Sequence, residues 1–384
     1  MCLSQRSGIF GRTSQPTGID RIPQPIYALR MVTERARRRC RERIEQLAES
    51  SLDSESLRRE AIAELKLAIG FERYCVPLAD PETEVVYAGV AETDHIQELP
   101  RLLFHDASLG EPNNGTALAR GRVRAGRLSG VTHGELGRSR RWSESLERFG
   151  TGDELRVIAR DELGIWGRFD LWRDHDDRPF DSADDKLLED VAVHLGRALR
   201  RTAVAVRDTP PATPLEAGVL LVDEGLRPLG GTPPTWEWFQ TLNPARIPYA
   251  DGVPSLVWAA IGRLAAIERG EDQGSPARIR IRAADGNWAV IEAARMQGMP
   301  GTFAVTIHPA GVREVLGIIC RAYGLTTRER EVVELIAEGL DTNDIAKRLY
   351  ISPYTVQDHL KSTFEKVGVN SRLQLLTGVL AQAS

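Results

Sequence analysis

The sequence predicts a multidomain chain in which two α+β domains precede an all-α domain with a helix-turn-helix core. Three observations predict this fold class. Helical stretches alternate twice with pairs of apolar strand segments between residues 26 and 310, which is typical of α+β domains. Residues 207–215 have the Pro- and Thr-rich composition of a linker. Residues 324–384 contain only short amphipathic helices, and 384 residues are enough for two or three separate cores.

The chain is expected to begin with a disordered tail over residues 1–25, which are rich in Ser, Gly, Thr and Pro. A long helix starts near Ile26, and its stretch Arg35–Arg43 is strongly basic. Such a stretch is compatible with binding to nucleic acid or to a membrane. We favour the alternative that the arginines are the solvated flanks of an apolar seam. The seam consists of Ala36, Cys40, Ile44 and Leu47.

The first domain extends over residues 26–206 and continues with a helix over Ser54–Ile69. A strand is predicted over Phe71–Leu78, and Pro77 within it indicates an edge position because proline cannot donate to a neighbouring strand. The segment Glu84–Val90 is its predicted hairpin partner. The Gly- and Arg-rich residues that follow, Pro112–Gly152, are expected to form loops.

A second hairpin is predicted to pair Glu154–Arg160 with Gly164–Trp172. A helix begins at Asp181 and has one apolar side. That side consists of Leu187, Leu188, Val191, Leu195 and Leu199. Helix, strand pair, variable middle, strand pair and helix form the layout of an α+β sensor domain. By this pattern the first domain resembles a GAF domain.

The second domain is predicted over residues 216–310 and opens with the strand Gly218–Asp223. Helical stretches follow around Trp236 and over Leu256–Ile267. Three strands close the domain, with Asp285-Gly286 as the turn between the first two: Ala277–Ala283, Asn287–Met296 and Thr302–His308. This order of elements resembles a PAS domain. Residues 311–323 are predicted to form a helix that connects it to the last domain.

The last domain has helix caps at consistent places. Thr327 is predicted to cap its first helix, which Gly339 ends in a left-handed conformation. Thr342 is predicted to cap the second helix. Ser352 caps the third helix, with Pro353 at the first helical position, where its missing N–H costs nothing.

Each of these helices has an apolar face at helical spacing. The faces consist of Val332, Leu335 and Ile336, of Ile345, Ala346 and Leu349, and of Val356, Leu360, Phe364 and Val367. A fourth helix is predicted from Ser371-Arg372, with Leu373, Leu376, Val379 and Leu380 on one side. A tight turn between the second and third helices is the shape that places one helix in a DNA major groove.

The domain carries a specific series of motifs: Leu325-Thr-x-Arg-Glu-x-Glu331, Ile345-Ala, Thr355-Val356-x-x-His359 and Lys366-x-Gly-Val. Over residues 324–384 the chain resembles the DNA-binding domain of LuxR-type transcription regulators. Two positions depart from the family. The turn residue, often Gly, is Tyr350, which costs roughly 1 kcal/mol if it is left-handed. The residue after Val356, often Lys, is Gln357.

The resemblance implies contacts with double-stranded DNA through the second and third helices and their flanks. The candidate residues are Thr342, Asn343, Ser352, Tyr354, Thr355, Gln357, Asp358, Lys361, Lys366 and Arg372. Gln357 can pair with adenine and Asp358 can accept from cytosine N4, whereas Lys366 is expected to contact phosphate. The hydroxyls of Ser352 and Thr355, and that of Thr342 in the second helix, lie near helix amides that attract phosphate. The alternative is that they only cap helices.

The charge of the chain and of its last domain limits how strongly the domain is expected to bind DNA. The chain has a formal net charge of −4, and Leu325–Ser384 has seven Lys and Arg against eight Asp and Glu. A nearly neutral module is expected to bind DNA weakly alone and to act as a homodimer. Two seams are candidate interfaces: Ala36, Cys40, Ile44 and Leu47 in the first helix, and Leu188, Val191, Leu195 and Leu199 near residue 190. The alternative is that either seam is buried within its own domain. RNA polymerase is a further candidate partner. The alternative is a non-enzymatic signalling or scaffold protein that acts mainly through protein contacts.

No motif supports an enzyme. The chain lacks a phosphate-binding loop, a zinc-protease motif and a nucleophile elbow. Its sequence also does not resemble a phospho-receiver domain. Cysteines and histidines are scattered, so neither a metal nor another cofactor is expected. No run of eighteen apolar residues and no secretory signal is present, which predicts a cytoplasmic protein without a membrane partner.

Aromatic residues are the remaining clue to a regulatory signal. Tyr74, Trp166, Phe169 and Trp172 are candidates for the wall of an apolar pocket that binds an unknown small ligand. The alternative is that they pack in the core. The sequence therefore predicts a cytoplasmic DNA-binding transcription regulator that responds to a ligand or partner bound by its sensor domains.

Overall fold

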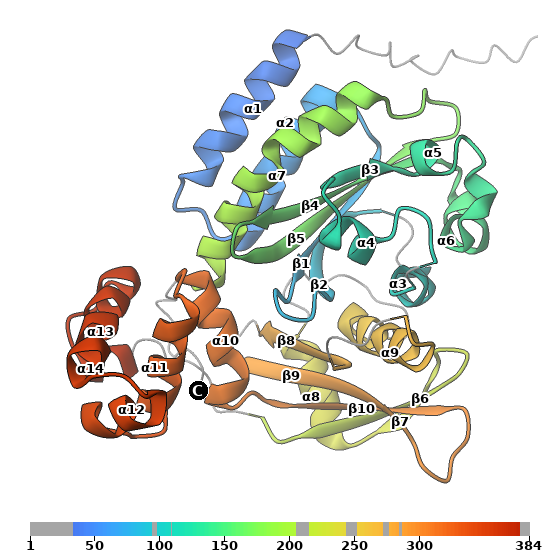
Figure 1. The fold of residues 1–384 in the computed structure, drawn as a ribbon. Coiled ribbons are helices and arrows are strands. Elements are labelled where there is room, and N and C mark those ends of the chain that lie inside the picture. The colour runs from blue at the N-terminus through green and yellow to red at the C-terminus, as the bar shows by residue number, and fades with distance from the viewer. Residues whose placement is uncertain are drawn as a thin grey trace, which may run out of the picture.

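The computed structural model describes residues 34–93, 98–108, 110–204, 215–242, 252–271, 276–283 and 286–376. They form two five-stranded antiparallel sheets and a C-terminal group of helices. Figure 1 shows the sheets one above the other, with the C-terminal helices to one side. The order of two α+β domains and one all-α domain is thus confirmed. The predicted tail over residues 1–25 and residues 207–214 of the predicted linker lie outside the described residues.

The first sheet has the strand order β2-β1-β5-β4-β3. Its strands are β1 (Arg73–Ala79), β2 (Val86–Glu92), β3 (Ala125–Arg127), β4 (Thr151–Asp161) and β5 (Gly164–Asp174). Both predicted hairpins are present. The edge position inferred from Pro77 is wrong, because β1 pairs with β2 and with β5. The register shifts between Val76 and Leu78, and this bulge accommodates the missing amide.

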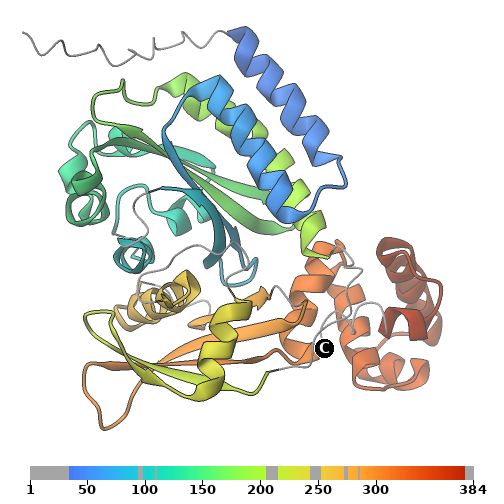
Figure 2. The same ribbon diagram turned by 180° about the vertical axis from the view of Figure 1, so that it is seen from behind.

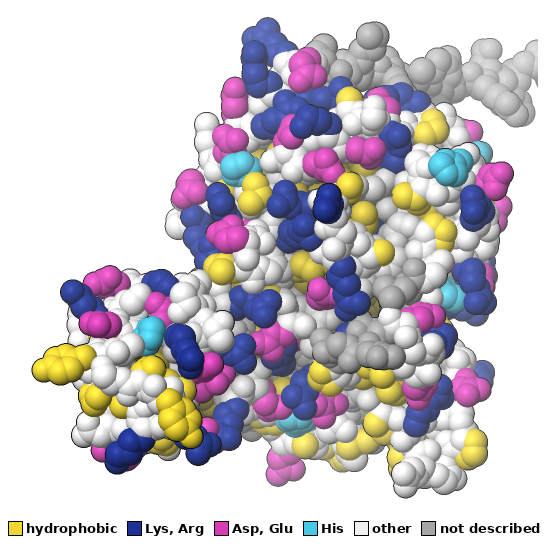
Figure 3. Space-filling view, viewed as in Figure 1, with side chains coloured by type: hydrophobic (Ala, Val, Ile, Leu, Met, Phe, Trp, Pro, Cys, Tyr) yellow, Lys and Arg dark blue, Asp and Glu magenta, His cyan; other side chains and the backbone are white. Residues whose placement is uncertain are grey.

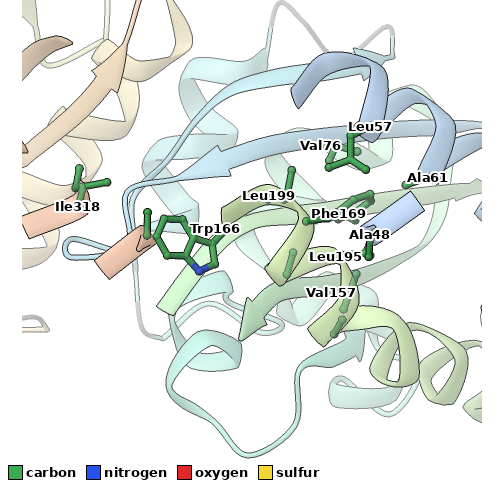
Figure 4. Packing of buried hydrophobic residues seen from close by; sticks show 14 of the residues in the cluster. Ala48, Leu57, Ala61, Val76, Val157, Trp166, Phe169, Leu195, Leu199 and Ile318 are labelled. Carbon is green, nitrogen blue, oxygen red and sulfur yellow. The ribbon is translucent and has the colours of Figure 1, made fainter. Parts of the chain in front are cut away.

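Three helices cover one face of this sheet: α1 (Glu34–Ala48), α2 (Ser54–Ile69) and α7 (Ser182–Ala203). Figure 4 shows Phe169, Leu195 and Leu199 within the apolar layer between sheet and helices. The two seams predicted from the sequence are used in this layer. Their buried members are Cys40, Ile44, Leu47, Leu187, Leu188, Val191, Leu195 and Leu199. These seams therefore do not form a free surface for a second copy.

The basic stretch of α1 contributes to the same layer. Arg37 pairs with Asp184 at 2.9 Å, and Arg41 pairs with Asp190 at 2.9 Å, both across to α7. The expectation of solvated flanks is therefore wrong for Arg37, which is buried, and holds for the exposed Arg38 and Arg39.

The segment expected to be loops, Pro112–Gly152, is more regular than predicted. It contains the edge strand β3 and the short helices α4 (Gly115–Arg120), α5 (Leu128–Val131) and α6 (Arg140–Glu144), preceded by α3 (Leu99–Asp106). Asn114 caps α4 and Ser139 caps α6 through their side chains. Elements of three to six residues are too short to show a hydrophobic period, which is why the sequence did not predict them.

The second sheet has the order β7-β6-β10-β9-β8. Its strands are β6 (Gly218–Asp223), β7 (Pro228–Gly231), β8 (Arg278–Arg282), β9 (Trp288–Arg295) and β10 (Thr302–Pro309). Counted along the chain, this is the order of the first sheet. The short Pro- and Gly-containing β7 was not predicted. The assignments of the first domain as GAF-like and the second as PAS-like stay predictions.

Helix α8 (Pro233–Thr241) packs on β6, whereas α9 (Ser255–Glu268) lies between the two domains. It contacts β9 of its own sheet and α3 and β2 of the first domain, as Figures 1 and 2 show. Its side chains are buried on most sides, among them Leu256, Trp258 and Arg263. A helix that is apolar almost all round is expected where two layers meet.

The predicted connecting helix is α10 (Val312–Ala322), and it is followed by α11 (Thr327–Ala337), α12 (Thr342–Leu349), α13 (Pro353–Val367) and α14 (Arg372–Leu375). The buried cluster of the first domain continues through α10 into the helix-turn-helix, and it includes both Trp166 and Ile318, which are labelled in Figure 4. Trp288 and Val290 of β9 join it, but most of the second domain's core is separate. The C-terminal domain is therefore held by packed side chains.

Candidate nucleic-acid interface

Capping residues fix where the first two helices of the last domain begin. Thr326 and Glu329 form a reciprocal box, because the Glu329 carboxylate accepts from the Thr326 amide at 2.7 Å and the Thr326 hydroxyl from the Glu329 amide at 3.3 Å. Asp341 caps α12 and accepts from the Asn343 amide at 2.8 Å. The predicted caps, Thr327 and Thr342, each lie one residue after the observed caps, Thr326 and Asp341.

The turn between α12 and α13 has the predicted geometry. Tyr350 ends α12 in the left-handed region, with φ 56° and ψ 45°. Ser352 caps α13, since its hydroxyl oxygen accepts from the Thr355 amide at 3.1 Å, and Pro353 occupies the first turn. Gly339 is also left-handed, with φ 86°. These local predictions are confirmed.

The inner faces of α12 and α13 hold the two helices together, with Ile345 and Val356 fully buried. The opposite surface is open to solvent. Its exposed candidates are Asn343, Ser352, Tyr354, Gln357, Asp358 and Lys361, whereas Thr342, Thr355 and Arg372 are half-buried. The amide of Gln357 donates to the hydroxyl of Thr342 at 3.4 Å, so the two helices present a joined polar surface.

Two of the predicted DNA-contacting cations are engaged inside the domain. The ammonium group of Lys366 donates to the Glu329 carboxylate at 2.7 Å, and Ser362 donates to the other oxygen at 2.6 Å. The guanidinium of Arg372 donates to the backbone carbonyl of Leu340. The phosphate contact expected of Lys366 stays a prediction, and its pair with the buried Glu329 carboxylate favours a structural role.

The four candidates for an aromatic pocket do not share a cavity. Tyr74, Trp166 and Phe169 are buried in the core on the side covered by α1, α2 and α7. Trp172 projects from the other face of β5, because successive side chains of a strand point to opposite faces. The burial of the first three residues favours core packing, the alternative stated above, and the ligand role of the four residues stays a prediction.

A buried network of charges covers that other face. Arg156 and Arg168 both pair with Asp106, Arg168 also pairs with Asp170 at 2.8 Å, and Arg141 pairs with Glu154. Burial alone would raise the pKa of Asp106, but the surrounding guanidinium groups hold it well below its usual range. The alternation of Glu154, Arg156, Arg168 and Asp170 with apolar residues on β4 and β5 was the sequence signal for it.

Two small cavities lie between this face and α9. One, of about 50 Å³, is lined by Trp172, Cys75 and Tyr87 and by Ser255 of α9. The other, of about 40 Å³, is lined by Val86 and Arg168 and by Ala259 of α9. Each site thus has walls from both α+β domains.

In the described part of the chain, no group of three or more His, Cys, Asp and Glu side chains is arranged to hold a metal ion. Within the same residues, no helix combines the length and apolar character needed to cross a membrane.

The geometry of α11, α12 and α13 defines a helix-turn-helix domain, the class of module with which regulatory proteins bind DNA. Residues 324–378 match the family described as bacterial regulatory proteins, luxR family. The chain belongs to this family, and the region of membership is its C-terminal domain.

Curated relatives match the same region. The chain is 54% identical over 57 residues to an HTH-type transcriptional regulator of Mycobacterium tuberculosis (strain ATCC 25618 / H37Rv), which is 15% of this chain and 6% of that protein. It is 43% identical over 56 residues to the spore germination protein GerE of Bacillus subtilis (strain 168), with 15% of this chain and 76% of GerE covered. The chain therefore spans only a small fraction of the Mycobacterium relative.

A solved structure resembles a larger part of the chain. The crystal structure of a bacteriophytochrome from R. palustris covers 72% of this chain and 64% of its own, with a TM-score of 0.31 and 10% sequence identity. These values are too low to support an argument about the two upstream domains.

Proposed function

We propose that this protein is a transcription regulator that binds specific double-stranded DNA sequences through α13. The observation that carries the proposal is the exposed, polar N-terminal half of that helix, where Gln357, Asp358 and Lys361 have no role in the core. Gln can pair with the edge of adenine, Asp can accept from cytosine N4, and Lys can reach guanine or phosphate.

Genomic footprinting with the full-length protein tests this proposal, since it reports both binding and the preferred sequence. Discrete protected sites with a shared motif are expected. A gel-shift titration over several salt concentrations separates the proposal from the scaffold alternative. A scaffold would give no retarded complex at any salt concentration, and that result would refute DNA binding.

Control by a small ligand is the second part of the proposal. The supporting observation is that both cavities are lined by residues of the two α+β domains. Their volumes, about 40 and 50 Å³, are far smaller than the roughly 300 Å³ of the smallest usual small-molecule sites. A ligand at this site must therefore move α9 away from the first sheet. Of the arginines that line the cavities, Arg141, Arg156 and Arg168 are paired with carboxylates, which favours a neutral, mostly apolar ligand over an anion.

Native mass spectrometry of the purified chain tests for such a ligand. A compound retained by the wild type and lost in Ala259→Trp, which fills one cavity, is expected. If a compound binds the wild type and the variant equally, its binding site lies elsewhere in the protein.

A second copy and RNA polymerase are proposed partners. Paired half-sites about one DNA turn apart would compensate for a nearly neutral binding domain. The interface must use a surface other than the two seams, which are buried in the first domain. Sedimentation with and without DNA tests the dimer, and a monomer of 42.5 kDa under both conditions would refute it.

A further inference from the structure

Tyr350 has a position that the fold itself does not explain. Its side chain is 95% exposed, and its backbone lies in the left-handed region with φ 56°. For a residue with a Cβ atom, that conformation costs roughly 1 kcal/mol relative to glycine. The tyrosine gains almost no buried area in return. Strained residues of this kind are frequent at functional sites, so the reason for this side chain lies in what the surface contacts.

The surroundings of Tyr350 indicate what that contact is. It lies two residues before Ser352, the cap of α13, and four before Tyr354, which is 85% exposed. Among the residues that the structure describes, neither phenol hydroxyl has a hydrogen-bond partner. Figure 3 shows hydrophobic side chains standing out from the C-terminal lobe, and its exposed large ones are Tyr350, Tyr354 and Leu373. Two phenols therefore flank the start of the proposed recognition helix.

The charges of the domain leave few cations for the DNA backbone. Five of the seven Lys and Arg of residues 325–384 are engaged within the domain. They are Arg328, Arg330, Lys347, Lys366 and Arg372. Arg348 and Lys361 have no ion pair with any described residue. Since most protein–DNA hydrogen bonds go to phosphate and sugar, neutral donors must supply contacts that lysines and arginines supply elsewhere.

We propose that the hydroxyl of Tyr350 donates a hydrogen bond to a DNA phosphate at the edge of the groove that α13 enters. Tyr354, one helical turn further on, contacts the same strand. The contact is assigned to the backbone because Tyr350 lies in the turn and outside the helix that reaches base edges. The inference rests on the proposed DNA binding and adds a positioning residue that carries no charge.

The test uses the full-length chain and duplexes that the wild type enriches from a random-sequence pool. Tyr350→Phe removes only the hydroxyl, and Tyr350→Asn removes the phenol but keeps a residue that tolerates the left-handed region. Both are expected to raise Kd roughly tenfold, the effect of a hydrogen bond to a charged group. The slope of log K against log salt should be unchanged, because no cation is lost. The melting temperature of Tyr350→Asn should equal or exceed that of the wild type.

His133→Asn is the matched control, because His133 is also exposed and left-handed, with φ 54°, but lies in the first domain. It should leave Kd unchanged. Wild-type affinity in Tyr350→Phe would overturn the phosphate contact, and a lower melting temperature with unchanged affinity in Tyr350→Asn would assign the residue to the fold. If the wild type enriches no duplex, the proposed function itself fails.

Discussion

The carboxylate of Asp80, in the turn after β1, forms a two-point ion pair with the guanidinium of Arg280 on β8, 200 positions further along the chain. Nε donates to Oδ2 at 2.8 Å and Nη2 donates to Oδ1 at 2.7 Å. Asp80 is fully buried. The same guanidinium donates to the backbone carbonyl of Glu314 in α10 at 3.1 Å. The pair therefore joins both α+β domains to the helix that holds the DNA-binding domain.

Arg280→Met is expected to lower the free energy of unfolding by about 3–5 kcal/mol, because it leaves the Asp80 carboxylate buried without its partner. The double variant Asp80→Asn/Arg280→Met should lose less, since no buried charge remains. Urea unfolding of the three proteins measures both effects.

The exposed pair of Arg227 and Asp223, four residues apart, provides the control. Arg227→Met should cost less than about 1 kcal/mol. Equal midpoints for Arg280→Met and Arg227→Met would contradict a structural role for the junction.

The two lysines of α13 are expected to differ in their effects. Lys366→Ala should lower the melting temperature and leave the DNA affinity of the folded protein unchanged, because its amine pairs with Glu329 at 2.7 Å. Lys361→Ala should weaken DNA binding and leave stability unchanged, because Lys361 is exposed. Melting curves and titrations on the same DNA check both, and a reversed pattern would reject the assignment.

Glu329 should make the stability of the last domain depend on pH. Burial alone would raise its pKa, but hydrogen bonds from Lys366, Ser362 and the Thr326 amide lower the pKa from 4.5 to about 2. Since the folded pKa is depressed, this stabilisation is fully present above about pH 5 and is lost as the pH falls towards 2.

Glu329→Gln should therefore reduce stability at pH 7 by roughly 2–3 kcal/mol and flatten the pH dependence between 5 and 2. Unfolding midpoints of wild type and variant at pH 7, 4 and 3 test this. Parallel curves would show that Glu329 does not provide the pH dependence.

Asp358→Ala is expected to change which base pairs are preferred, because a carboxylate accepts from cytosine N4 and is repelled by the acceptor atoms of guanine and thymine. The loss should be roughly 1–3 kcal/mol at one base-pair position and small at the others. A panel of operator variants measures it, with Glu365→Ala, exposed nearer the other end of α13, as the control. An unchanged order of preference would remove Asp358 from base reading.

Local features of the last domain could be predicted because they depend on residues within about four positions of one another. Ser352 with Pro353, the left-handed Gly339 and the left-handed Tyr350 are of this kind. Thr327 and Thr342 were each misplaced by one residue, because Thr326 has a capping box with Glu329 and Asp341 is a stronger acceptor for α12.

The sequence by itself determined the longer helices and strands, the order of the domains and the family of the last one, since these follow from periodicity, caps and short motifs. Only the tertiary structure decided which faces are covered. Phe169 and Trp172 lie on opposite faces of β5, and α7 buries one face, whereas Leu102 of α3 and Trp142 of α6 cover Trp172 on the other. Likewise, Asp80 meets Arg280 only after the two α+β domains pack together, and no local pattern encodes a contact across 200 positions.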